Sequence, residues 1–264
     1  MNKLIHHSLK DDSTYPNNER LPLTDYDRIR YNRQMLIRGW GEAGQARLKS
    51  ARVFIAGAGG LGSPVAMYLA AAGVGEIRLC DVDRVELSNL NRQILHCDER
   101  IGQPKTVSTE KTLKTLNPTV KVLAFPEYLD AENIDRVAGR PDILLDCLDN
   151  YETRYLLNRY ALEQHIPLVH GAIWGMTGQA TFLHPPKTPC MRCLVPEPPP
   201  REVFPVLGAT PGVIGCIQAM EALKFLTGVG EVLRGRLLIF DGEEMVFHSA
   251  RVERDPTCPE CSRL

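Results

Sequence analysis

The stretch RVFIAGAGGLGSPVAMYLAAAG, residues 52–73, decides the fold. Its first five residues are mostly apolar and predict a short buried strand, and the alanine-rich part predicts a helix that ends at Ala72. Between the two, glycines are spaced so that the chain turns tightly and backbone N–H groups at the helix start face a phosphate. The stretch therefore predicts a nucleotide-binding loop made by Gly57, Gly59, Gly60 and Gly62.

Strands and helices alternate along most of the chain. Short apolar runs predict strands at residues 52–56, 76–80, 120–124, 142–147 and 167–170, with helices at 106–116, 131–138 and 153–164. This alternation predicts an α/β fold with a doubly wound, mostly parallel, Rossmann-like sheet. Beyond about residue 171 the pattern changes, and strands are expected at 179–183, 236–241 and 245–252, with a helix at 213–226. The C-terminal region is therefore expected to be rich in strands.

The N-terminal part precedes this alternation. Residues 1–23 are polar and without periodicity, and we expect them to form an N-terminal arm. Thr24 is predicted to cap a helix that carries Arg30 and Arg33, and a second short helix is expected at 42–49.

The composition excludes some classes of function. The chain has 264 residues, of which 44% are hydrophobic and 24% are charged, and its formal net charge is −1. These values are typical of a globular protein and give no electrostatic attraction to nucleic acid or to an anionic membrane. The longest apolar run, 65–74, is too short to cross a bilayer, and residues 1–20 lack a secretory pattern. We expect a cytoplasmic protein that binds neither nucleic acid nor membrane.

Charged and amide side chains follow the predicted strand ends. Asp81 ends the second strand, where a carboxylate can bind ribose hydroxyls. The others are Asn89, Arg92, Lys105, Asp149 and Asn150. An NAD-dependent oxidoreductase needs few cations beside a pyrophosphate that backbone N–H groups already hold, whereas a triphosphate undergoing displacement needs its charge offset. The pattern favours ATP, with Asp149 as a ligand of Mg²⁺.

Together these motifs resemble the ThiF/MoeB/HesA family, bacterial and archaeal relatives of ubiquitin-activating enzymes. The resemblance covers about residues 26–261 and rests on RYNRQ (30–34), GAGGLG (57–62) with Pro64, NLNRQ (89–93), Lys105, Asp149-Asn150 with Arg154, and two C-x-x-C pairs. It implies an ATP-dependent adenylyltransferase that activates the C-terminal Gly carboxylate of a ubiquitin-like sulfur-carrier protein, ending in Gly-Gly, and releases pyrophosphate. It also implies one adenylation domain over residues 24–264, with a nucleotide-binding part at about 50–171 and a carrier-binding and zinc part at about 172–264.

The resemblance also implies roles for single residues. Asp81 is expected to bind the ribose, Asp149 to serve the magnesium ion, and Asn89, Arg92 and Lys105 to contact the phosphates. Arg33 is expected to reach across a homodimer interface into the partner's site. Two roles stay open: Arg154 either contacts ATP or pairs with Asp149, and Asp83 is either structural or shares the metal.

Four cysteines predict a metal centre. Cys190/Cys193 and Cys258/Cys261 form two C-x-x-C pairs, and two such pairs complete the tetrahedral sulfur shell of a structural Zn²⁺. A redox-active pair needs a different local fold, and an iron–sulfur cluster uses the same ligands. We expect structural zinc that pins the C-terminal region.

A cysteine that several family members carry is missing here. They have it in the loop after the first C-x-x-C pair, whereas this sequence has none between Leu194 and Gly215. We therefore expect the reaction to stop at the acyl-adenylate, which a separate sulfur donor then attacks. Cys216 is the nearest other thiol, and its place early in a helix favours a lowered pKa. The remaining cysteines, Cys80, Cys97 and Cys147, are expected in the core.

The target and two alternative functions stay open. Carriers of molybdopterin (molybdenum cofactor) and of thiamine biosynthesis fit equally well. The alternatives are adenylation of another small protein or peptide, and a non-catalytic scaffold that binds the carrier.

Overall fold

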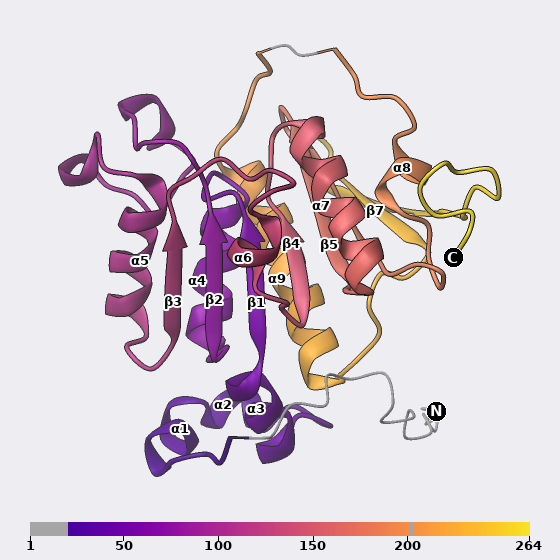
Figure 1. Cartoon of the computed structure of the whole chain (residues 1–264). Helices are drawn as coiled ribbons and strands as arrows, with labels where there is room; N and C mark the ends of the chain where they lie inside the picture. Colours follow the sequence, from indigo (N-terminus) through magenta and orange to yellow (C-terminus); the bar gives the residue numbers. More distant parts are fainter. Residues whose placement is uncertain (1–20, 201–202) are drawn as a thin grey trace.

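In the computed structural model, which describes residues 21–200 and 203–264, one sheet carries the fold. Its strands lie in the order β3-β2-β1-β4-β5-β6-β7-β8 (Figure 1). The parallel strands are β1 (Arg52–Ala56), β2 (Glu76–Cys80), β3 (Lys121–Phe125), β4 (Ile143–Asp146) and β5 (Leu168–Trp174). The antiparallel strands are β6 (Thr177–Leu183), β7 (Arg236–Asp241) and β8 (Val246–Arg251). The doubly wound, mostly parallel sheet is confirmed.

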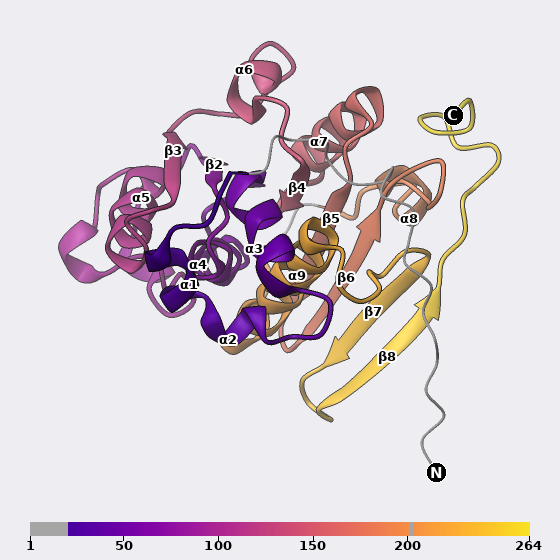
Figure 2. The ribbon, with the colours of Figure 1, turned by 90° about the horizontal axis from the view of Figure 1, so that it is seen from below.

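Helices cover both faces of the sheet (Figure 2). One face carries α4 (Gly62–Ala72), α5 (Lys105–Leu116) and α9 (Ala209–Thr227), and the other carries α6 (Ile134–Ala138) and α7 (Tyr151–Gln164). Successive side chains of a strand point to opposite faces, so Val53 and Ile55 pack into one buried cluster while Phe54 packs into the other. Strands buried on both faces explain why their sequences read as continuous apolar runs.

The N-terminal helices differ from the single helix expected there. Thr24 caps α1 (Asp25–Arg30) in a capping box with Asp27, but the helix stops and α2 (Asn32–Met35) follows. Tyr31 stands between them with φ −101° and ψ 11°. Its ring is buried, and its hydroxyl oxygen accepts a 2.8 Å hydrogen bond from Asn117 Nδ2. This contact to the end of α5, which the local pattern does not reveal, holds the chain in a turn. The helix expected at 42–49 is α3 (Gly41–Ser50).

Other boundaries differ as well. β5 continues to Trp174 because it pairs with β6 along its whole length, so the parts before and after residue 171 share one sheet. Short elements not foreseen are α8 (Met191–Leu194) and the 3-10 turns η2 (Leu87–Asn89) and η3 (Asp98–Arg100). Of the expected N-terminal arm, residues 1–20 lie outside the described part. No helix in the described part is long and apolar enough to cross a membrane.

Candidate functional site

A cleft of about 940 Å³ lies where the parallel strands end. Its walls include residues that directly follow β1, β2 and β4, namely Gly57, Asp81 and Cys147. β1 stands between β2 and β4, where the winding of the sheet reverses direction. Ligands of open α/β sheets bind at this position. The lining includes these predicted site residues: Gly57, Gly59, Gly60, Asp81, Arg92, Lys105, Asp149 and Asn150.

The glycine loop enters the cleft between β1 and α4. Gly57 has φ +99°, and a Cβ there would come within 2.5 Å of the Cys147 carbonyl oxygen, so only glycine fits. Gly59 and Gly60 line the cleft, while Gly62 begins α4 and packs on the Gly57 carbonyl. The N-terminus of α4 therefore faces the cleft, as a phosphate-binding loop requires.

Asp81 lies beside this loop. Its Oδ2 accepts a 2.7 Å hydrogen bond from the Ala58 N–H, and its Oδ1 accepts one of 2.8 Å from the Asp83 N–H. Burial raises the pKa of Asp81, while the charge of Lys105 and the two N–H donors act against this. The carboxylate is thus fixed at the cleft wall, with acceptor capacity left for ligand hydroxyl groups.

Two cations face the same cleft. Lys105 is the first residue of α5, is 6% exposed, and places its Nζ 2.8 Å from Asp83 Oδ2. Arg92 donates through Nη1 to the Ser88 carbonyl and to the Asn91 side chain, at 3.0 Å each. Of the two roles left open for Asp83, the structure shows an ion pair with Lys105. Both cations line the same cleft as the glycine loop.

Asp149 and Asn150 follow β4. Asn150 caps α7, because its Oδ1 accepts a 2.9 Å hydrogen bond from the Thr153 N–H. Asp149 is exposed and lines the cleft. Mg²⁺ in nucleotide sites is held by one or two carboxylates and the substrate phosphates, so an exposed carboxylate here fits that ion.

Three predicted residues are not part of the cleft lining of this chain. Gly62 is the first residue of α4. Asn89 is buried in η2, where its Oδ1 accepts a 3.1 Å hydrogen bond from the Glu86 N–H. Arg33 is exposed on α2, which lies near the amino ends of the strands, at the other end of the sheet (Figure 1). Within one chain, Arg33 is therefore far from the glycine loop.

A buried polar network below the cleft was not foreseen from the sequence. His170 Nδ1 lies 2.7 Å from Asp146 Oδ2, and both side chains are almost completely buried. Burial acts to raise the pKa of Asp146, but the charge of Arg154 and the His170 hydrogen bond bring it below its ordinary value. Burial lowers the pKa of His170. The only sequence signal was a polar residue at or near the end of each of two predicted apolar strands, 142–147 and 167–170.

Arg154 belongs to this network. Its Nε lies 3.4 Å from Asp146 Oδ1, and its Nη2 donates to the carbonyls of Leu148 and Gly171. The alternative in which Arg154 pairs with Asp149 is therefore wrong. Because Leu148 and Arg154 itself line the cleft, the guanidinium group ties the cleft floor to the buried carboxylate.

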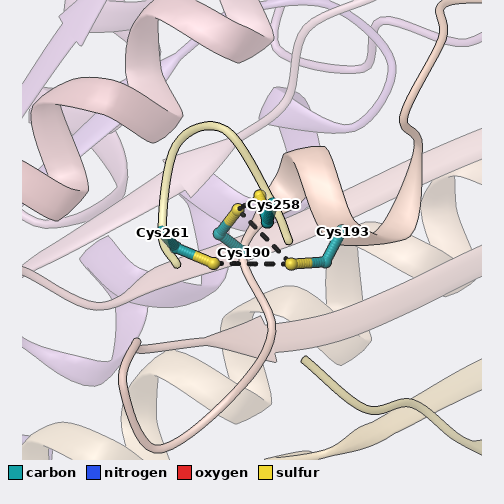
Figure 3. Close-up of side chains that lie close together, drawn as sticks. All are labelled: Cys190, Cys193, Cys258 and Cys261. Atoms are coloured by element: carbon teal, nitrogen blue, oxygen red, sulfur yellow. Dashed lines mark hydrogen bonds between the residues drawn. The ribbon is translucent and has the colours of Figure 1, made fainter. Parts of the chain in front are cut away.

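The four predicted metal ligands come together (Figure 3), and they pack against Leu162 of α7. Cys190 Sγ lies 3.8 Å from Cys193 Sγ and 3.7 Å from Cys258 Sγ, and Cys193 Sγ lies 3.4 Å from Cys261 Sγ. All four sulfurs lie within 4.8 Å of one another. Sulfurs held about 2.3 Å from a tetrahedral zinc ion are about 3.8 Å apart. The cluster therefore fits Zn²⁺ with a closed shell, which is a structural site.

One segment connects this centre to the cleft. The described residues that follow α8, before and after 201–202, help to line the cleft, among them Pro198, Val203 and Val206. At the near end, Tyr155 of α7 donates a 2.7 Å hydrogen bond to the Val195 carbonyl. At the far end, Phe204 stacks on Trp174 of β5 with ring centroids 5.7 Å apart. The metal centre thus anchors the chain that forms one wall of the cleft.

Burial raises the thiol pKa of three of the remaining cysteines. Cys80 and Cys147 are buried, as expected; burial raises the pKa of Cys80 to about 12 and that of Cys147 well above its ordinary value. Cys216 is partly buried in α9, and burial raises its pKa rather than lowering it. Cys97 is exposed, so its expected place in the core is wrong: the chain turns outward into η3 at this point.

Comparisons with known proteins agree with this geometry. A model of the ThiF family matches residues 31–260. The "SAMP-activating enzyme E1" of Haloferax volcanii is 47% identical over 238 residues, which cover 88% of each chain. The "Sulfur carrier protein adenylyltransferase" of Thermus thermophilus is 45% identical over 243 residues, which cover 88% of this chain and 90% of that protein. The crystal structure of E. coli MccB with AMPCPP and MccA matches with a TM-score of 0.74 at 26% identity, over 83% of this chain and 69% of that one.

Proposed function

Because this chain belongs to the ThiF family and is an adenylyltransferase, we propose that it adenylates the C-terminal Gly carboxylate of a ubiquitin-like sulfur-carrier protein. ATP is the donor, and pyrophosphate leaves. One observation carries the proposal: Asp81, Arg92 and Lys105 surround a glycine loop in a cleft that continues to the C-terminal strands. Such a cleft has room for a nucleotide and, beside it, for an extended chain end.

The nucleotide half of the cleft supports ATP. A triphosphate on the glycine loop would meet N–H groups at the N-terminus of α4 and the cations of Arg92 and Lys105. Asp81 would accept hydrogen bonds from the ribose hydroxyls. Mg²⁺, when bound, offsets phosphate charge and orients the leaving pyrophosphate, and Asp149 is the residue that would hold it. Asn89 would not touch the nucleotide itself but would shape the turn that carries Arg92.

The part of the cleft that would hold the carrier's C-terminal carboxylate needs little acid–base chemistry. A C-terminal carboxylate is ionised at neutral pH, so it attacks the α-phosphorus without a general base. The protein's contribution is to hold the two reactants in line and to offset charge as the bond to pyrophosphate breaks. The buried Asp146–Arg154 pair supports this by fixing the cleft floor.

Arg33 would complete the site of the partner in a homodimer. It lies away from its own chain's glycine loop, which is compatible with a role in trans. Around it, α1 and the end of α2 expose large apolar side chains, Ile29 at 80% and Leu36 at 70%. Exposed apolar surface of this kind marks protein–protein contacts.

The acyl-adenylate would then react with a separate sulfur donor. The thiols that line the cleft are those of Cys80 and Cys147, and the raised pKa of each keeps it protonated and unreactive. The sulfur would therefore come from outside this chain. Carriers of molybdopterin and of thiamine biosynthesis are both candidates for the substrate.

The experiment that tests the proposal is ATP–pyrophosphate exchange by folded, zinc-loaded protein. Candidate carriers ending in Gly-Gly are added one at a time, each beside a copy that lacks the last glycine. Exchange that requires one carrier and its last glycine supports adenylation and identifies the substrate. Binding of a carrier without any exchange would instead favour the scaffold, and exchange driven by a short peptide would favour peptide adenylation.

A further inference from the structure

His170 has a defined protonation state, because of its neighbours. Its Nδ1 faces the carboxylate of Asp146 at 2.7 Å. Arg154 already neutralises that carboxylate, so a second positive charge on a fully buried imidazole would be uncompensated and costly. Burial accordingly lowers the pKa of His170. The imidazole is therefore neutral, with its proton on Nδ1 and a free acceptor at Nε2.

This tautomer sets the orientation of Gln179. The Nε2 atom of Gln179 lies 3.4 Å from the Nε2 atom of His170. Because that imidazole nitrogen can only accept, the Gln179 amide must turn its NH₂ group toward it. The carbonyl oxygen, Oε1, then points to the other side, where Gln179 lines the cleft. The charge of Asp146 thus fixes, through His170, a hydrogen-bond acceptor in the cleft wall.

The surroundings of Gln179 fit an extended polypeptide. In the sheet, Gln179 pairs with Ala172 of β5 and Ile239 of β7, and both of these line the cleft. Trp174 and Phe204 line the same part. Apolar side chains around a hydrogen-bond acceptor suit a chain of small residues that offers a backbone N–H.

The position also separates Gln179 from the nucleotide. The glycine loop follows β1, and β6 is three strands away in the order β1-β4-β5-β6. Strands are spaced about 4.8 Å apart, which places Gln179 about 14 Å across the sheet. Ribose would lie on the other side of the loop, at the end of β2. Gln179 is therefore on the acyl side of the α-phosphate.

We propose that Gln179 recognises the carrier's C-terminal tail by accepting a hydrogen bond from a glycine N–H, and that Asp146 and His170 act as positioning residues that hold it in this orientation. The inference rests on the proposed function, since it names a recognition contact of the same site. His170 is faced by Asp146 from β4, Arg154 from α7 and Gln179 from β6, and Gln218 of α9 donates to the Asp146 carbonyl at 2.8 Å.

The orientation of Gln179 by Asp146 and His170 is tested first, without any carrier. Histidine-selective ¹⁵N labelling of the whole protein reports the protonation of each ring nitrogen, and a His170→Asn variant identifies the signals of His170. We expect a neutral ring with the proton on Nδ1 at neutral pH. An imidazolium, or a proton on Nε2, would overturn the assigned orientation of Gln179.

The contact is tested by a double-mutant cycle on pyrophosphate exchange. Gln179→Met removes the acceptor with little change of size, and a carrier with an ester in place of one of its last two peptide bonds removes the N–H. Each change alone should raise the KM for the carrier about tenfold, the effect of one hydrogen bond. Together they should do no more than one alone. The KM for ATP should stay within about twofold, because Gln179 lies on the acyl side.

A matched control is Gln164→Met, the same change at the end of α7, outside the cleft lining. It should leave the KM for the carrier unchanged. If Gln179→Met leaves the KM for the carrier unchanged, like this control, the inference is wrong while adenylation stands. The same holds if each ester raises that KM by the same factor in wild-type protein and in Gln179→Met. If no carrier supports pyrophosphate exchange by the wild-type protein, the proposed function fails. The labelling experiment then still decides whether Asp146 and His170 fix the orientation of Gln179.

Discussion

The Nζ atom of Lys105 lies 2.8 Å from Oδ2 of Asp83, yet only the lysine is buried: the two side chains are 7% and 61% exposed. An ion pair with one exposed partner contributes at most about 1 kcal/mol. A buried cation in the cleft, by contrast, is available to offset phosphate charge as it develops. We therefore expect the pair to hold the lysine in place and the lysine to act on the phosphates.

We predict that Lys105→Met slows pyrophosphate exchange by about a hundredfold or more, the cost of losing one preorganised charge in a catalytic site. Asp83→Asn should slow it by less than about fivefold. Steady-state exchange rates of the two variants check this. Equal losses in both would mean that the carboxylate, too, acts on the reaction.

The sequence predicts those features of the site whose residues are close together in the chain. The glycine loop follows from residues 52–73, because Gly57 and its neighbours form a continuous strand, turn and helix. The zinc ligands were predictable for the same reason, since each C-x-x-C pair is local. The pairing of Asp146 with His170 joins residues from two different strands. It depends on the strand order, which no single segment specifies.

Two errors have a similar origin. The helix after Thr24 breaks because Tyr31 contacts Asn117, far away in the sequence. β5 extends to Trp174 because β6 pairs with it. Propensity and periodicity describe neighbours in the chain, whereas these limits are set by tertiary contacts. The role of Arg33 stays a prediction, because one chain alone does not reveal what an exposed side chain meets in an assembly.

The buried histidines predict how stability depends on pH. Burial lowers the pKa of His96, His170 and His184. An unfolded histidine has a pKa of about 6.5, so below that pH the unfolded chain binds protons that the folded chain does not. The stability that these neutral histidines contribute should therefore be fully present near pH 7. The free energy of unfolding should fall as the pH drops toward about 5, by up to about 1.4 kcal/mol per pH unit for each histidine.

Urea unfolding at several pH values measures this slope. His170→Asn should reduce it by the contribution of one histidine, whatever its effect on stability at neutral pH. A slope that the substitution leaves unchanged would show that His170 does not stay neutral in the folded protein.

The four cysteines predict one zinc ion in each chain. Cys258→Ser should lose the metal and lower the melting temperature, since a structural zinc site contributes on the order of 10 kcal/mol to folding. Elemental analysis and thermal unfolding check both effects. The matched control is Cys97→Ser, an exposed cysteine outside the cluster, which should keep the zinc. Purified wild-type protein that holds iron, or no metal, would contradict the assignment.

Arg33 predicts complementation between subunits. Arg33→Ala and Asp149→Ala should each be inactive, but mixed dimers should regain activity, with about a quarter of all sites intact after random exchange. The control pairs Asp149→Ala with Lys105→Met. Both residues line the cleft of one chain, so this mixture should recover nothing. If subunits exchange and the first mixture also stays inactive, Arg33 does not act in trans.

The most direct test of the central claim is the mass of the carrier itself. The protein is incubated with Mg²⁺, ATP and a carrier ending in Gly-Gly, and the products are examined by mass spectrometry. We predict a carrier that gains one adenylyl group at its C-terminal glycine, and a gain at least about a hundredfold slower with Lys105→Met. A carrier of unchanged mass, in the presence of zinc-loaded protein that binds both ATP and the carrier, would contradict it.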